Sequence, residues 1–170
     1  MDVVEALYNG SKELDLFLLA NKELSLKIYA DANLRKNLLL ASASYFEKEI
    51  TYSILGFIKI VAHEDQRLIT FVEKKALSRQ YHSLFDWNCN NCNAFLGLFG
   101  DEFKKAFTST ISANPELGDA VRAFMEIGQE RNRMVHQDFG LYTLEKTPDE
   151  ILALHKKAKI FVVAMKESLN

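Results

Sequence analysis

The long stretch from Asp31 to about His63 contains no recognisable helix stop signal, and this limits what the chain can fold into. Asp31 is a suitable N-cap residue at its start. At ~1.5 Å per residue, a helix of this length is a rod of roughly 45 Å. Apolar residues recur within it at steps of three, four or seven, the period of one helix face: Leu39, Ala43, Phe46, Ile50, Phe57 and Val61.

The rest of the chain shows the same period in shorter stretches. The strongest start signals are Asn114-Pro115-Glu116 and Thr147-Pro148-Asp149-Glu150, each a cap residue followed by proline and an acid. The break at Asn9-Gly10-Ser11 suggests that residues 1–10 form a loose arm. The other expected helices cover about 11–29, 65–79, 102–112 (capped by Asp101), 115–136 and the residues after Pro148.

No segment has the alternating period of a strand, and only seven glycines and two prolines interrupt the 170 residues. A chain of this length, 48% hydrophobic, can bury its own core as one domain. The sequence therefore predicts an all-α, up-and-down bundle of about five main helices, with no sheet, in a single domain spanning 1–170.

The charge balance limits the classes of partner. A formal net charge of −2 argues against a broad basic surface for nucleic acid, although it leaves room for a small basic site. No apolar run is long enough to cross a membrane, and the first five residues lack a signal pattern. We therefore expect a cytoplasmic protein without a membrane contact.

The two cysteines, Cys89 and Cys92, form a C-x-x-C pair beside an aromatic segment. Such a pair can be half a zinc site or a redox dithiol, but no second pair follows and the βαβ context of a thioredoxin is missing. Even with His82 as a third ligand, a fourth is lacking. Reduced thiols in a loop are favoured, with Phe85 and Trp87 filling the core from that loop.

Residues 115–136 carry the most informative pattern. Six of these residues follow one another at separations of four, three, four, three and four, so they form one stripe on a single face of a helix. Four of the six are apolar, and Gly128 and Arg131 are the exceptions. Glycine inside a helix costs roughly 1 kcal/mol relative to alanine, so Gly128 predicts close approach of another backbone. Arg131 needs an anion, a carboxylate partner or a solvent-filled cleft. The stripe consists of Leu117, Val121, Phe124, Gly128, Arg131 and Val135.

Arg131, Asn132 and His136 lie within side-chain reach of one another at the end of this helix. A guanidinium can grip a phosphate and stabilise charge in a transition state, and an imidazole can exchange a proton near neutral pH. This set suits phosphodiester cleavage without a metal. The alternatives are an ion pair of Arg131 with Glu126 or Glu130, and a histidine favoured at the helix end by the dipole.

Glu47 shares a face with core positions of the long helix, so it must face a cation, water or a site unless it reaches solvent at the edge of the stripe. Arg131-Asn132-x-x-x-His136 resembles the R-N-x-x-x-H signature of HEPN-superfamily ribonucleases. The segments 38–47, Leu98-Phe99-Gly100 and 147–151 are similar to the RiboL-PSP-type HEPN branch, from about residue 11 onward.

This resemblance implies a helical bundle that forms a homodimer, in which two motifs meet to build one RNA-cleaving cleft. Arg131 and His136 would be the catalytic pair, and Asn132 would orient His136 or the phosphate. Glu47 would be a supporting acid, and Arg133 would help to bind the RNA backbone. Family members typically need no metal or other cofactor and act in toxin–antitoxin, phage-defence or RNA-processing settings, so an antitoxin is a possible further partner.

Two hypotheses of different classes follow. The first is an endoribonuclease in which the ribose 2′-OH attacks the phosphate and leaves a 2′,3′-cyclic end. The second is a non-catalytic HEPN-like module that binds a nucleotide or a partner protein. A plain helical scaffold would instead leave Arg131 paired with an internal carboxylate such as Glu47, with no open cleft.

Overall fold

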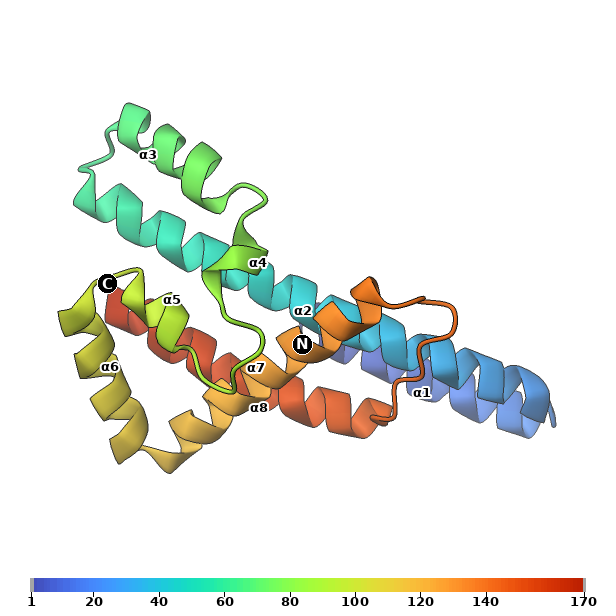
Figure 1. The fold of residues 1–170 in the computed structure, drawn as a ribbon. Helices are drawn as coiled ribbons and strands as arrows, with labels where there is room; N and C mark the ends of the chain where they lie inside the picture. The colour runs from blue at the N-terminus through green and yellow to red at the C-terminus, as the bar shows by residue number, and fades with distance from the viewer. Residues whose placement is uncertain (1, 170) are drawn as a thin grey trace.

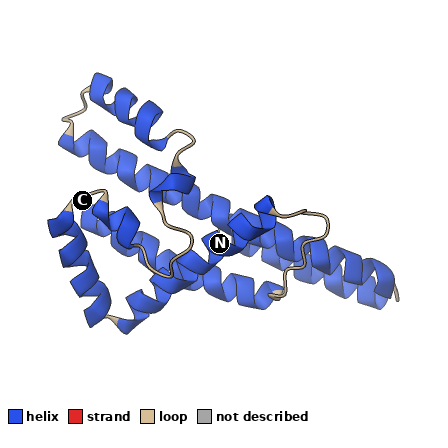
Figure 2. Ribbon diagram, viewed as in Figure 1, coloured by secondary structure: helices blue, strands red, loops and turns tan. Residues whose placement is uncertain are grey.

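The computed structural model describes residues 2–169. This part of the chain is about 80% helical and contains no strand (Figure 2). The expected all-α bundle of about five main helices is therefore confirmed. Those helices are α1 (Val3–Ala20), α2 (Leu24–Val61), α6 (Asp101–Ala113), α7 (Pro115–His136) and α8 (Pro148–Leu169). The short elements are α3 (Gln66–Val72), a π-helical turn η1 (Glu73–Leu77), α4 (Tyr81–Leu84) and α5 (Asn93–Gly97).

The 38-residue helix α2 is the longest element, and α1, α7 and α8 pack against it, whereas α6 packs against α5 and α7 (Figure 1). Helix α1 lies beside its first half, α8 packs against both α2 and α7, and α3 with η1 folds back along its other end. Three helices meet at an aromatic centre, where the Phe124 ring contacts Phe46 at 5.5 Å and Phe161 at 4.9 Å between centroids. This centre joins α7 rigidly to α2 and α8.

The N-terminal segment differs from the expected loose arm over residues 1–10. Helix α1 already begins at Val3, while Met1 lies outside the described residues. The carboxylate of Asp2 accepts hydrogen bonds from the backbone N–H groups of Val4 and Glu5, and the Glu5 side chain binds the Asp2 N–H in return. The helix therefore starts at this capping box and not at Ser11, and α1 continues without a break through Gly10.

A buried polar chain fixes Asp2 to the last helix. The His155 side chain, 0% exposed, has its Nδ1 2.8 Å from the Ser42 hydroxyl on α2 and its Nε2 3.1 Å from an Asp2 carboxylate oxygen. Lys159 donates to that same oxygen at 2.8 Å. Burial lowers the pKa of His155, with Asp2 opposing the shift. Because every member has a partner, the chain satisfies its buried polar groups and joins α1, α2 and α8.

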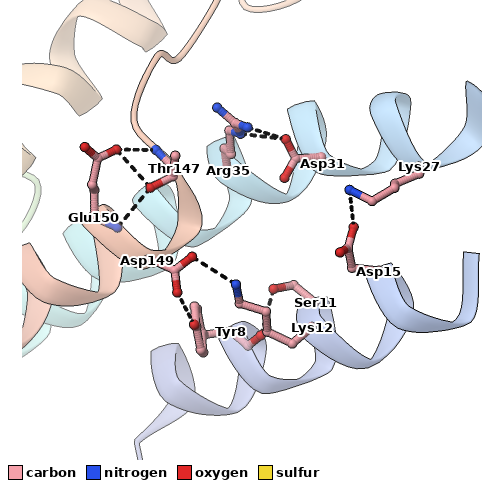
Figure 3. Close-up of polar contacts among 10 residues, drawn as sticks. All are labelled: Tyr8, Ser11, Lys12, Asp15, Lys27, Asp31, Arg35, Thr147, Asp149 and Glu150. Carbon is pink, nitrogen blue, oxygen red and sulfur yellow. Dashed lines mark hydrogen bonds and ion pairs between the residues drawn. The ribbon is translucent and has the colours of Figure 1, made fainter. Parts of the chain in front are cut away.

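The start of α2 also differs from the prediction. The helix begins at Leu24, so Asp31 lies inside it and pairs with Arg35 at 2.5 Å instead of capping. Asp15 and Lys27 connect α1 to α2 at 2.7 Å. These pairs lie on one side of the α1–α2 hairpin, facing the start of α8 (Figure 3).

The beginning of α8 confirms the predicted capping box. Thr147 Oγ1 accepts from the Glu150 N–H at 3.2 Å, and a Glu150 carboxylate oxygen accepts from the Thr147 N–H at 2.7 Å (Figure 3). The neighbouring Asp149 carboxylate accepts from the Tyr8 hydroxyl and, at 2.9 Å, from Lys12 on α1. The start of α8 is therefore tied to the middle of α1.

The helix expected over 65–79 is shorter and irregular. Asp65 caps α3, which ends at Val72. The π-helical turn η1 follows directly and ends at Leu77. Residues 78–92, here called the connector, then run past α4 to α5 (Figure 1). Phe85 is buried and stacks on Phe95 at 4.4 Å, which confirms that this loop helps to fill the core.

Candidate functional site

Helix α7 sets the position of the motif. The Asn114 side chain accepts from the Leu117 N–H at 3.2 Å and Pro115 occupies the first turn, so the predicted start is confirmed. The helix ends at His136, which places the motif in its last turns. Met134 is fully buried there, whereas His136 is exposed. Burial of Met134 fixes the rotation of α7 and turns its neighbours outward.

Gly128 is needed for a contact within the chain. A Cβ atom at this position would lie 1.9 Å from Cζ3 of Trp87. The prediction that Gly128 allows close approach of another backbone was therefore wrong, because the indole side chain of Trp87 fills that space. The indole N–H donates to the His82 carbonyl oxygen at 2.9 Å, so the connector is held against α7 at this point.

A hollow of about 330 Å³ opens between α2, the connector and α7. Glu47 lines it from α2, and Arg131 and Asn132 line it from α7. The connector wall contributes Tyr81, whose pKa is raised by burial first and then by the negative charge of Glu47, while Arg131 opposes the shift. Glu47 and Arg131 thus both affect the pKa of Tyr81, but they form no ion pair with each other within residues 2–169.

A second hollow of about 650 Å³ lies on the other side of Asn132. Its lining includes Asn132, Arg133 and His136, whereas Arg131 lines only the first hollow. The opposite wall is the asparagine-rich end of the connector, which is fixed to α7 because the Gln129 amide donates to the Cys89 carbonyl oxygen at 2.8 Å. Asn132 and Trp87 line both hollows, so the two hollows adjoin, with Arg131 in the first and His136 in the second.

The motif side chains have few partners of their own. Arg131 donates from Nη1 to Oδ1 of Asn132 at 3.0 Å, and His136 has no hydrogen bond or ion pair in the described part of the chain. Asn132 is therefore bound to Arg131, whereas the prediction that it orients His136 stays untested.

The carboxylates that were expected to neutralise Arg131 are used elsewhere. Glu126 pairs with Lys146 at 2.5 Å. Glu130 pairs with Arg133 and accepts from the Tyr142 hydroxyl at 2.7 Å. Burial, followed by this hydrogen bond, raises the pKa of Tyr142 to about 12. The structural ion pair for Arg131 is thus not formed with either acid, and Arg133 is held by Glu130 at the rim.

The sequence pattern had singled out Arg131, Asn132, Arg133, His136 and Glu47, and the fold brings all five to the two adjoining hollows. It did not place the connector at the site, although Arg79, His82 and Trp87 line the first hollow. The C-x-x-C pair and the aromatic residues were the signals in that segment, and they do not indicate which helix it will face.

The cysteines have different environments. Cys92 is buried, and burial raises the pKa of its thiol to about 12. The Cys89 thiol donates to the Asp86 carboxylate at 3.0 Å. Across residues 2–169, no three His, Cys, Asp or Glu side chains gather as ligands for a metal ion. A search of the same residues found no helix long and apolar enough to span a bilayer.

The helical bundle, with its Arg–His motif at the end of α7, has the architecture of a HEPN-type domain. A family model described as RiboL-PSP-HEPN matches residues 5–170, and the chain belongs to this family. The expected membership of the HEPN superfamily is therefore confirmed, whereas the roles of the motif residues stay predictions. Searches of curated proteins and of solved structures found no match.

Proposed function

We propose that this protein is a metal-independent endoribonuclease with Arg131 and His136 as its catalytic pair. The observation that carries the proposal is the state of these two side chains. Arg131 opens onto a hollow without a carboxylate partner among the described residues, and His136 is exposed beside it without a hydrogen bond. A cation and an imidazole that are left free at one helix end suit a phosphodiester substrate.

The proposed reaction is a transesterification. The ribose 2′-oxygen attacks the adjacent phosphorus, the bond from phosphorus to the 5′-oxygen breaks, and a 2′,3′-cyclic phosphate and a 5′-hydroxyl are formed. His136 accepts the proton of the 2′-OH or donates one to the departing 5′-oxygen. Arg131 stabilises the charge that grows on the phosphoryl oxygens. Asn132 and Glu47 hold the groups in position, and Arg133 contacts the RNA backbone from the rim.

A second copy of the chain completes the site in this proposal. Within one chain Arg131 and His136 line different hollows, so the His136 of a partner could complete the hollow of Arg131. Apolar side chains flank His136 on the surface: Val135 is 42% exposed, Phe139 43% and Leu141 82%. Exposed apolar residues beside polar site residues are characteristic of protein interfaces.

Cleavage of a labelled RNA in the presence of EDTA tests the reaction. Arg131→Ala and His136→Ala are each expected to abolish cleavage while the circular dichroism spectrum is unchanged, and mass spectrometry of the wild-type products should detect the cyclic phosphate. Arg122→Ala is the matched control, because Arg122 is an exposed arginine of the same helix that pairs with Asp119. Wild-type rates in both site variants would refute the assignment.

The oligomer is tested separately. Leu141→Asp places a charge on a loop side chain that the fold does not bury, so it should produce monomers by light scattering and remove cleavage together. A variant that remains dimeric or cleaves as a monomer would contradict the shared site. Binding of RNA or a nucleotide without cleavage by the wild-type protein would favour the non-catalytic module.

The wider role is also part of the proposal. A small ribonuclease of this family suits a toxin or a phage-defence effector, whose activity an antitoxin protein would restrain. Growth arrest on expression of the wild-type chain, but not of His136→Ala, would support this role, and equal growth of the two strains would oppose it.

A further inference from the structure

The arginines of this chain divide into two groups. Four of the six pair with a carboxylate of the same chain: Arg35, Arg67, Arg122 and Arg133. Arg79 and Arg131 have no such pair within residues 2–169, and both line the hollow of about 330 Å³. The two guanidinium groups without an acid therefore face the same space, one from the connector and one from α7.

The backbone at Arg79 follows the end of a helix. Its φ angle is +61°, in the left-handed region, as it is at Lys22, His63 and Glu64, which follow α1 and α2. The residue directly follows Ser78, whose N–H donates to the Glu73 carbonyl oxygen at 2.7 Å to close η1. A left-handed residue commonly ends a helix in this way, so the end of η1 sets the direction of the chain at Arg79.

The connector wall is rigid where it carries Arg79. Leu77 before it and Leu84 after it are buried. Trp87 rests on Gly128 and donates to the His82 carbonyl oxygen at 2.9 Å, which fixes the remainder of the connector to α7. The backbone of Arg79 thus lies between anchored residues, so binding at the hollow does not require this part of the connector to become ordered.

We propose that Arg79 binds a second backbone phosphate of the RNA, next to the phosphate held by Arg131. Two cations at one hollow suit two successive phosphates of a single strand, and the only acid that lines the same hollow among the described residues is Glu47. The inference rests on the proposed ribonuclease function and adds a site for the substrate strand on the connector. Arg79 is a binding residue, and the reacting atoms belong to Arg131 and His136.

The experiment measures binding apart from cleavage. A single-stranded RNA oligonucleotide with 2′-O-methyl groups at every ribose cannot undergo 2′-OH attack, so its dissociation constant can be measured with the intact wild-type protein. Fluorescence of Trp87, the chain's one tryptophan, provides a second reading, because its indole lines the hollow. Arg79→Ala should weaken binding about tenfold, and the slope of log Kobs against log salt should fall by about 0.7, the value for one phosphate contact on a single strand.

Two variants keep the test interpretable. Arg67→Ala removes an arginine whose side chain is 92% exposed on α3, and it should leave both affinity and salt slope unchanged. Arg79→Gly removes the guanidinium but suits the positive φ, so it should match Arg79→Ala in binding while folding at least as stably. Equal affinity of Arg79→Ala, Arg67→Ala and wild type would overturn the inference.

The outcomes separate this inference from the function on which it rests. Binding that depends on Arg79, without cleavage of ordinary RNA by the wild-type protein, would refute the ribonuclease but retain the phosphate site. Cleavage that depends on Arg131 and His136, together with RNA binding that does not change in Arg79→Ala, would support the ribonuclease and refute the phosphate site at Arg79. Cleavage kinetics give a further check: Arg79→Ala should raise KM about tenfold and leave kcat within about twofold.

Discussion

The substitution Gly128→Ala tests how tightly the connector is held against α7. The new Cβ would lie 1.9 Å from Cζ3, 2.4 Å from Cε3 and 2.7 Å from Cη2 of the Trp87 indole. Carbon atoms do not approach so closely, so the indole has to move. It cannot rotate freely, because its ring packs against Phe85 at 5.0 Å and Phe124 at 6.1 Å between centroids.

Two opposing contributions set the size of the effect. Alanine in place of glycine inside a helix stabilises by about 1 kcal/mol. Overpacking a filled space typically costs 1–3 kcal/mol, and each aromatic contact that is lost adds about 0.5–1.5 kcal/mol. Displacement of Trp87 from Phe85 and Phe124 therefore outweighs the helix gain. We expect Gly128→Ala to lower the free energy of unfolding by about 2 kcal/mol.

Urea unfolding followed by circular dichroism measures this change. The matched control is Gly56→Ala, because Gly56 is also inside a helix but a Cβ there would have no neighbour within 4 Å. That variant should gain up to about 1 kcal/mol. In a Trp87→Ala background, Gly128→Ala should lose its cost, since the obstructing ring is gone. If Gly128→Ala is as stabilising as Gly56→Ala in the wild-type background, the close contact does not exist.

The remaining predictions concern the polar contacts that fix the helices. Burial lowers the pKa of His155 from 6.5, so the folded protein takes up fewer protons than the unfolded chain below that pH, and the free energy of unfolding should fall as the pH drops from about 7 to 5. His155→Gln should flatten this dependence in urea titrations, and an unchanged slope would contradict it. Thr147→Ala removes the cap of α8 and should lower Tm by about 2–4 °C, about 1 kcal/mol of stability, in a calorimetric scan. Thr110→Ala, at an exposed position whose hydroxyl bonds its own helix, should have a smaller effect.

The parts of the fold that were predictable are those determined by local sequence. Asn114 and Thr147 cap their helices as expected, because a cap needs only residues within one turn, whereas the predicted caps Asp31 and Asp101 lie within α2 and α6. Residues 1–10 were wrongly predicted to be a loose arm because a long-range contact holds them. The capping box of Asp2 and Glu5 is visible in the local sequence, but His155 anchors it, and no local pattern connects His155 to the N-terminus.

The candidate site shows the same division. The period of α7 correctly placed Arg131 and Gly128 on a stripe that departs from apolar character, and the motif marked His136. What faces Gly128 depended on the path of the connector, and the Trp87 side chain lies where another backbone had been predicted. Arg79 could not be recognised, because the absence of a carboxylate partner is a property of the folded surface and not of spacing.

The contacts of α8 also limit when the fold can be completed during synthesis. Helix α8 packs against α2 and α7 and holds Asp2, so the α1–α2 hairpin lacks this part of its cover until α8 has been made. At the usual rate of translation this wait is on the order of ten seconds. The residues of the motif emerge earlier than α8, and α7 then lacks its packing against that helix. In a chain that we propose cuts RNA, the helix that carries the motif therefore reaches its final packing only after α8 has been made.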